Sequence, residues 1–249
     1  MANDDSTTRR QGILLVVALL LIGATLASFA IADPAGSTIS GAVTSFGPNS
    51  TPASRTDNRS TITTMVLSAI QQDQHWKAYV GNVTGILTLD NPSNFTIYSW
   101  DVTTVTGQVY ASRYNNITWS SSNIVCADAA VINAESVFHN MTAAQPDRLN
   151  RTFNWTVHKQ FQVGGNTIAE SSCNSTVTYM NDTRQVPTTG SPFQEVLIKD
   201  NANGYLVYMT SIDDDVQGYD NTSYDFQMIV AESDVKSSAT PYYFYVELR

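Results

Sequence analysis

Three histidines, His75, His139 and His158, are the side chains of this 249-residue chain best suited to transfer protons near neutral pH. They stand far apart, and none belongs to an HExxH pair or a GxSxG elbow. The chain also lacks a glycine-rich loop of the kind that cradles phosphate. His158 falls among the polar residues of an alternating run, so we expect it at the surface. The sequence therefore predicts a non-enzymatic protein with no catalytic residue and no cofactor.

Acidic side chains gather at Asp213, Asp214 and Asp215, and clustered carboxylate oxygens are the ligands that Ca²⁺ prefers. The cluster lacks the alternating Asp/Asn spacing and the closing glutamate of an EF-hand loop. A solvated hairpin loop is the favoured interpretation, and a calcium site is the alternative. The sequence predicts no other metal ligands.

The two cysteines, Cys126 and Cys173, are too few for a disulfide-stapled scaffold and lack the spacing of metal ligands. In an oxidising compartment a bridge between them would close the loop 126–173 and contribute about 4 kcal/mol in the chain-entropy model. We predict this disulfide, with two free buried thiols as the alternative.

Residues 13–32 form an apolar run without a charged residue, long enough as a helix to span about 30 Å of hydrocarbon. Arg9 and Arg10 precede the run and Asp33 follows it, so the positive-inside rule puts residues 1–12 in the cytoplasm. We expect a transmembrane helix with the lipid bilayer as its partner. The localisation that follows is the cell membrane, with the C-terminal domain extracellular.

Two other interpretations use the same run. Ala30-Ile31-Ala32 fits the cleavage site of a signal peptide, although the run is longer than the usual 7–15 apolar residues. Arg9-Arg10-Gln11-Gly12 followed by an apolar helix resembles the leader of archaeal type IV pilins. That resemblance implies a filament subunit that is cut after Gly12 and polymerises through the helix.

Sequons for N-glycosylation are frequent, because 11 of the 19 asparagines are followed by the x-[ST] pattern. The candidate sites are Asn49, Asn58, Asn82, Asn94, Asn116, Asn140, Asn150, Asn154, Asn174, Asn181 and Asn221. This frequency favours a glycosylated surface outside the cell. The alternative is a chain rich in Ser, Thr and Asn whose sequons stay unused.

Beyond the apolar run, residues 33–60 are rich in Ser, Thr, Gly and Pro and are expected to form a flexible stalk. Residues 61–249 then show short apolar and alternating runs, which predict a mainly β, mostly antiparallel, sandwich-like ectodomain with one solvated face on each sheet. The predicted strands are 61–70, 76–90, 95–102, 107–113, 150–163, 175–180, 193–199, 205–212, 224–231 and 242–248.

Three local expectations can be compared with the structure. The pair Asn203-Gly204 predicts a hairpin turn, and residues 127–138 show helical spacing and predict one short helix. In the segment 82–89, Val83, Leu87 and Leu89 are expected to face the core. The run 150–163 is expected to be one long strand, with these residues inward: Phe153, Trp155, Val157, Phe161 and Val163.

The net charge of the chain argues against polyanionic partners. The formal net charge is −9, and no Lys/Arg cluster follows Arg9 and Arg10, so nucleic acid is not an expected partner.

Several stretches resemble a group of uncharacterised archaeal surface proteins. They are WKAYVGNVTG at 76–85, LTLD at 87–90, YSW at 98–100, GQVYA at 107–111, YDFQMIV at 224–230 and YYFYVEL at 242–248. The resemblance implies an N-terminal anchor and a glycosylated β domain.

Taken together, the sequence predicts a non-catalytic, single-pass surface protein with a structural or surface-interaction role. Other surface proteins or further copies of the chain are the expected partners. A pilin-like filament subunit and an adhesion module that binds glycans or ions are the alternatives.

Overall fold

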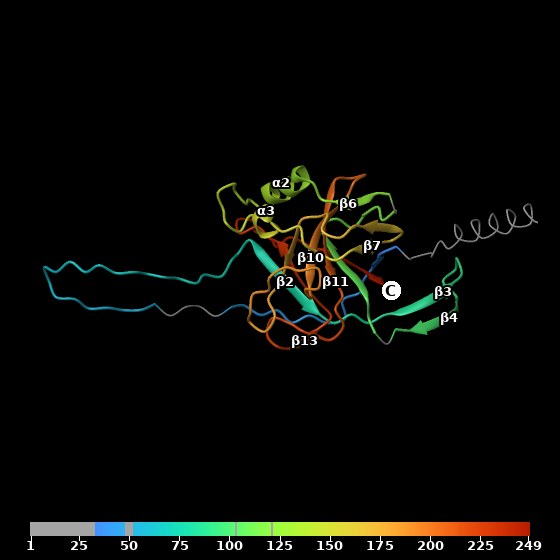
Figure 1. Cartoon of the computed structure of the whole chain (residues 1–249), viewed down its shortest axis with the longest axis horizontal. Coiled ribbons are helices and arrows are strands. Elements are labelled where there is room, and N and C mark those ends of the chain that lie inside the picture. The colour runs from blue at the N-terminus through green and yellow to red at the C-terminus, as the bar shows by residue number, and fades with distance from the viewer. Residues whose placement is uncertain (1–32, 48–51, 103, 121) are drawn as a thin grey trace, which may run out of the picture. The chain divides into compact units, whose positions relative to one another are not determined.

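A sheet of seven antiparallel strands forms the centre of the protein (Figure 1). The computed structural model describes residues 33–47, 52–102, 104–120 and 122–249. Its elements are β1 (Ala35–Gly36), β2 (Trp76–Gly81), β3 (Ile86–Asp90), β4 (Thr96–Asp101), β5 (Gly107–Ser112), β6 (Ile124–Cys126), α2 (Ala129–Phe138), α3 (Leu149–Thr152), β7 (Phe161–Val163), β8 (Asn166–Ile168), β9 (Ser175–Val177), β10 (Gln194–Asp200), β11 (Tyr205–Ser211), β12 (Val216–Gln217), β13 (Ser223–Tyr224), β14 (Phe226–Ala231) and β15 (Tyr243–Leu248). The domain is therefore mainly β, with two short helices among the described residues.

The large sheet has the strand order β1-β15-β5-β11-β10-β6, and β9 pairs with β10 as well. Every pair in it is antiparallel. Four smaller two-stranded pairings accompany it: β2 with β14, β3 with β4, β7 with β8, and β12 with β13. Gly107 begins β5 with φ +132°, and a Cβ at this position would collide with the backbone carbonyl of Glu247. Glycine is therefore required where β5 meets β15.

Hydrophobic clusters form around the central strands, which are buried along nearly their whole length. Leu197 and Tyr208 join Met228 and Val230 of β14 in one cluster. Val196, Val207 and Met209 belong to the other cluster, with Phe161 of β7. Since neighbouring residues of a strand point to opposite faces, both faces of β10 and β11 are covered. The expectation of one solvated face is wrong for this sheet.

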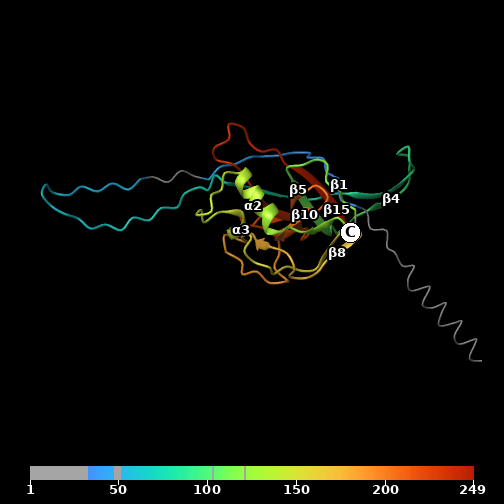
Figure 2. The same ribbon diagram turned by 90° about the horizontal axis from the view of Figure 1, so that it is seen from above.

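The helix α2 was expected and is confirmed (Figure 2). It begins after Asp128, whose carboxylate accepts a hydrogen bond from the Val131 amide at 3.0 Å. This N-cap satisfies one of the free amides of the first turn. Ile132 anchors the helix in the same cluster as Leu197 and Tyr208.

The hairpin between β10 and β11 also confirms a prediction. Asp200 pairs with Tyr205, and the intervening residues 201–204 make the turn. Gly204 adopts φ +69°, a conformation that glycine reaches without strain. The Asn203-Gly204 signal therefore identified the turn correctly.

The predicted strand 150–163 is wrong. The helix α3 occupies its start, Trp155 makes an isolated bridge to Ser175, and β7 begins only at Phe161. Phe153 is fully buried as expected, whereas Trp155 is 38% exposed. One helical turn at the beginning changes the direction of the following side chains, so the period of two cannot run through the whole segment.

Two further strand predictions need correction. Residues 61–70 form no strand, although Ile62 and Val66 are β-formers; both are almost fully exposed. In the segment 82–89, Val83 is buried, but Leu87 and Leu89 are exposed because nothing described covers the β3–β4 hairpin on that face.

At the N-terminal side, Ala35 and Gly36 of the expected stalk pair with β15 at the edge of the large sheet. No helix among the described residues combines the length and apolar character required to span a bilayer. The predicted transmembrane run, 13–32, lies outside the described residues.

Candidate functional site

The sequon asparagines lie mainly on the surface. Ten of the eleven are described, Asn49 being the exception, and nine of these ten are exposed. Asn174 is the half-buried one, and its Nδ2 donates a hydrogen bond to the Phe153 carbonyl at 2.9 Å. Asn94, Asn140 and Asn221 have positive φ, as asparagines in turns often do. An oligosaccharyltransferase could therefore reach most of these amides, whereas that of Asn174 is already engaged.

The predicted Cys126–Cys173 disulfide is confirmed, with the two Cα atoms 5.0 Å apart. Cys126 ends β6 and Cys173 comes shortly before β9, and both of these short strands pair with β10. The bridge thus ties together two segments that border the same central strand.

His158 organises the chain around this bridge and is buried, so its predicted surface position is wrong. Its Nε2 accepts hydrogen bonds from the amides of Ser172 and Cys173, both at 3.0 Å. Its Nδ1 donates to the Lys159 carbonyl at 2.8 Å. Burial lowers the pKa of His158, although the Lys159 carbonyl opposes this. The neutral imidazole accepts hydrogen bonds from two amides that would otherwise need a backbone carbonyl. The role of His158 is therefore structural.

The acidic run Asp213–Asp215 holds a turn after β11. Asp213 accepts hydrogen bonds from the Phe193 amide at 2.7 Å and from Ser211 at 2.9 Å, and it pairs with Lys159 at 3.2 Å. Asp214 accepts from the Val105 amide at 3.2 Å. Among the described residues, the three carboxylates of this run do not form a group whose ligand atoms all lie within 4.8 Å of one another. The calcium site stays the alternative interpretation, and the hairpin loop stays the favoured one.

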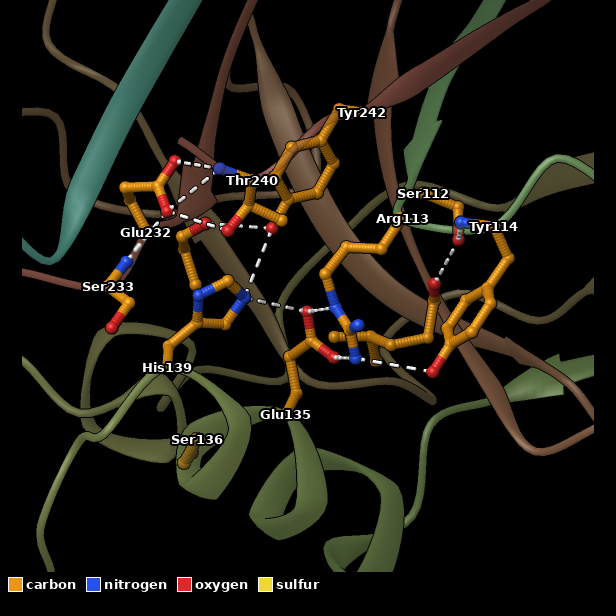
Figure 3. Close-up of polar contacts among 12 residues, drawn as sticks. Ser112, Arg113, Tyr114, Glu135, Ser136, His139, Glu232, Ser233, Thr240 and Tyr242 are labelled. Atoms are coloured by element: carbon orange, nitrogen blue, oxygen red, sulfur yellow. Dashed lines mark hydrogen bonds and ion pairs between the residues drawn. The ribbon is translucent and has the colours of Figure 1, made fainter. Parts of the chain in front are cut away.

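A buried polar network links α2 to the strands around it (Figure 3). Arg113 donates to both oxygens of Glu135, at 2.8 and 2.7 Å, in a bidentate pair. His139 Nε2 lies 3.1 Å from Glu135 and 3.4 Å from the Tyr242 hydroxyl, which donates to the Ala231 carbonyl. Burial by itself would raise the pKa of Glu135, but the hydrogen bonds from His139 and Arg113 lower it.

Glu232 adds a second carboxylate beside this network (Figure 3). It accepts hydrogen bonds from Lys77 at 2.8 Å and from the hydroxyl of Thr240 at 2.7 Å. Burial opposes ionisation, yet these donors lower the pKa of Glu232 to about 2. Each carboxylate of the network is matched by a basic partner, Glu135 by Arg113 and Glu232 by Lys77. The network therefore connects α2 to the chain just after β5 and just before β15, and the end of β14 to β2.

A different arrangement surrounds His75, which is 9% exposed. Its Nδ1 lies 2.8 Å from Asp147 Oδ2 and 3.8 Å from Asp73 Oδ1, and its Nε2 lies 3.3 Å from Asp234 Oδ1. One ligand atom from each of Asp73, His75 and Asp147 falls within 4.8 Å of the others. Among the described residues, this is the group of acidic, histidine and cysteine side chains whose geometry suits a metal ion.

The segments that supply this site are far apart in sequence. Asp73 and His75 directly precede β2, Asp147 lies between α2 and α3, and Asp234 follows β14. Sequence reasoning considered His75 only as a possible base and missed the three aspartates. The Asp-x-His spacing at 73–75 was the one local signal, and it was too short to indicate the distant partners.

Comparisons with protein-family models, with curated proteins and with solved structures found no match to this chain. Its function is therefore argued from its own residues.

Proposed function

We propose that this chain is a non-catalytic, single-pass membrane-anchored glycoprotein of the cell surface. Residues 13–32 form the anchor, and the β domain is presented outside the cell in a structural or surface-interaction role. In this proposal the domain is sandwich-like, with the β2–β14 ribbon packed over one face of the seven-stranded sheet.

The observation that carries the proposal is the state of the sequon asparagines. Nine of the ten described ones are exposed, and among the ten only Asn174 uses its amide nitrogen in a hydrogen bond. Among the seven described asparagines outside sequons, three donate from their amides to neighbouring groups: Asn123, Asn166 and Asn203. Free, exposed amides are what N-glycosylation requires, and glycosylation of this kind belongs to extracytoplasmic proteins.

The disulfide supports the same compartment. Disulfides persist in oxidising surroundings and are rare in reducing cytosol, and Cys126 and Cys173 are the two cysteines of the chain. An apolar run of about 20 residues before the domain supplies the means of attachment.

The test is to isolate the native full-length protein, determine its N-terminus and map its glycopeptides by mass spectrometry. We expect the protein in the membrane fraction after alkaline washing, with residues 13–32 retained and glycans on exposed sequons. Asn174 is the internal control and should show the lowest occupancy, because its amide is engaged.

Each alternative gives a different result. A mature N-terminus at Ile13, together with recovery in sheared fibres, would favour a filament subunit. An N-terminus at Asp33 would indicate a secreted protein. Unmodified sequons throughout would remove the glycoprotein part of the proposal.

A further inference from the structure

The His75 site has more negative charge than the basic side chains around it can balance, among the described residues. Asp73, Asp147 and Asp234 all lie within 4 Å of the one imidazole. None of these aspartates forms an ion pair with a lysine or arginine among the described residues, since their ion pairs are all with His75. Even a protonated imidazole would leave two uncompensated charges if all three were ionised, so the site favours a further cation.

The aspartates approach the ring from both sides. Asp147 and Asp73 lie on the Nδ1 side, at 2.8 and 3.8 Å, and Asp234 lies on the Nε2 side at 3.3 Å. Two carboxylates therefore share one nitrogen atom as their neighbour, which is the arrangement that a cation between them would require.

Both ring nitrogens of His75 have polar neighbours. Nδ1 lies 2.8 Å from Asp147 Oδ2 and 3.8 Å from Asp73 Oδ1, whereas Nε2 lies 3.3 Å from Asp234 Oδ1 and 3.4 Å from Gln145 Nε2. A histidine that binds a metal through one ring nitrogen usually has a carboxylate beside the other, which orients the ring. Asp234 is the carboxylate in that position.

The candidate ligands are also held in place by the backbone. The His75 amide donates to Asp73 Oδ1 at 2.7 Å. The carbonyl of Asp147 accepts hydrogen bonds from the Trp76 indole at 2.8 Å and from the Thr152 hydroxyl at 3.1 Å. Trp76, which directly follows His75, thus helps to hold Asp147 opposite His75.

The distances suit a common ion after a small adjustment. Two ligands that bind one ion at about 2.0–2.2 Å with tetrahedral angles are about 3.3–3.6 Å apart. The observed separations from Nδ1 are 2.8 Å to Asp147 and 3.8 Å to Asp73, on either side of that value. Shifts of about 0.5 Å in these two separations would give both carboxylates access to an ion at Nδ1.

We propose that His75 Nδ1, Asp73 and Asp147 bind a divalent transition-metal cation of the Zn²⁺, Co²⁺ or Mn²⁺ class, with Asp234 as the carboxylate that orients the imidazole. A nitrogen ligand favours these cations over Ca²⁺ and Mg²⁺, which take oxygen ligands. The ion joins the chain just before β2 to the loop after α2, and Asp234 connects the loop after β14 to the imidazole.

The direct test is calorimetric titration of the untagged, chelator-treated full-length protein in detergent with ZnCl₂, and with CaCl₂ as comparison. We expect one Zn²⁺ per chain at pH 7.5 and no comparable uptake of Ca²⁺, because a nitrogen ligand favours Zn²⁺. Titration with CoCl₂ should produce visible absorption bands of a low-symmetry site.

Variants assign the ligands. His75→Ala and Asp147→Asn should abolish the stoichiometric binding, and Asp234→Asn should weaken it about 10- to 100-fold, as loss of such an outer carboxylate does. The matched control is Asp220→Asn, which removes a carboxylate that contacts Tyr224 and Thr222 instead of any residue of the site; it should bind like the wild type.

Binding of Zn²⁺ that survives His75→Ala would overturn the proposal and indicate an adventitious surface site. Absence of stoichiometric binding by the wild type would overturn it as well. If His75→Ala does not fold, His75→Gln and the wild-type Co²⁺ spectrum decide. These measurements are independent of anchoring and glycosylation.

Discussion

Two hairpins of this protein have the same local construction and opposite surroundings. The β10–β11 hairpin lies in the middle of the large sheet and is nearly all buried. The β3–β4 hairpin is exposed at every residue, including Leu89 at 55% and Trp100 at 48% (Figure 1). Both are antiparallel pairs rich in residues that favour strands.

The register of the exposed hairpin shows what it lacks. Leu87 pairs with Trp100 and Leu89 with Tyr98, so these four side chains share one face. Tyr98 and Trp100 contact each other edge to face, with ring centroids 4.8 Å apart. No described layer covers this face, whereas β10 and β11 have clusters on both faces. The comparison teaches that a covering layer, rather than alternation, stabilises a two-stranded unit.

The largest expected effect follows from cutting the bridge beside β10. The double variant Cys126→Ala/Cys173→Ala frees the ends of β6 and β9 and should lower the free energy of unfolding by about 4 kcal/mol. Denaturant titration under non-reducing conditions measures the loss. Hydrogen exchange should quicken along β9 and β10 but not in β3 and β4; equal changes in both hairpins would contradict the comparison.

A matched pair of leucines gives the next effect. Leu197→Ala in β10 removes a fully buried side chain and should cost about 2–5 kcal/mol. Leu89→Ala in β3 removes one that is 55% exposed and should cost less than about 1 kcal/mol. Thermal and urea unfolding of the two variants decide, and similar losses would mean that an unseen layer covers β3 and β4.

Glu195 makes the stability of the central hairpin depend on pH. Burial raises the pKa of Glu195 well above its usual range, and a hydrogen bond from the Ile229 amide only partly opposes this. Since the folded pKa exceeds the unfolded value of about 4.3, the stability linked to the protonated carboxyl is present below about pH 4.3. It is lost as the pH rises toward the folded pKa.

The variant Glu195→Gln has a side chain of nearly the same shape, which does not titrate. Its stability relative to the wild type should increase with pH above about 4.3, by about 1–3 kcal/mol at neutral pH. Melting temperatures between pH 4 and pH 8 measure the trend. Asp90→Asn in the exposed hairpin is the control and should show no such trend; a flat difference for Glu195→Gln would mean that the carboxyl is hydrated.

The smallest effect is expected for Trp100→Ala. The side chain contacts Tyr98 but belongs to neither hydrophobic cluster, so global stability should fall by less than about 1 kcal/mol. The amides of β3 and β4 should nevertheless exchange faster, because the hairpin opens locally. A cooperative loss across β10 and β11 would show that the hairpin is part of the main folding unit.

The sequence by itself determined much of the β framework. The runs predicted from the sequence include β5, β10, β11, β14 and β15. In β10 and β11, which are covered on both faces, apolar residues stand at successive positions, as such strands need. Asn203-Gly204 indicated the central turn, and the spacing in 127–138 indicated α2. The bridge Cys126–Cys173 was also predicted, from the number of cysteines and from the oxidising compartment expected for the domain, and is confirmed.

Only the tertiary structure decided which faces are covered and which distant residues meet. Alternation shows that Leu87 and Leu89 share a face, but not whether another layer reaches it. Polar spacing suggested that His158 was exposed, yet it is buried, where its Nε2 accepts hydrogen bonds from the amides of Ser172 and Cys173. Asp73 and His75 meet Asp147 and Asp234 only because the segment before β2 lies beside the loops that follow α2 and β14. Such convergence depends on the path of the whole chain, which local residue patterns do not specify.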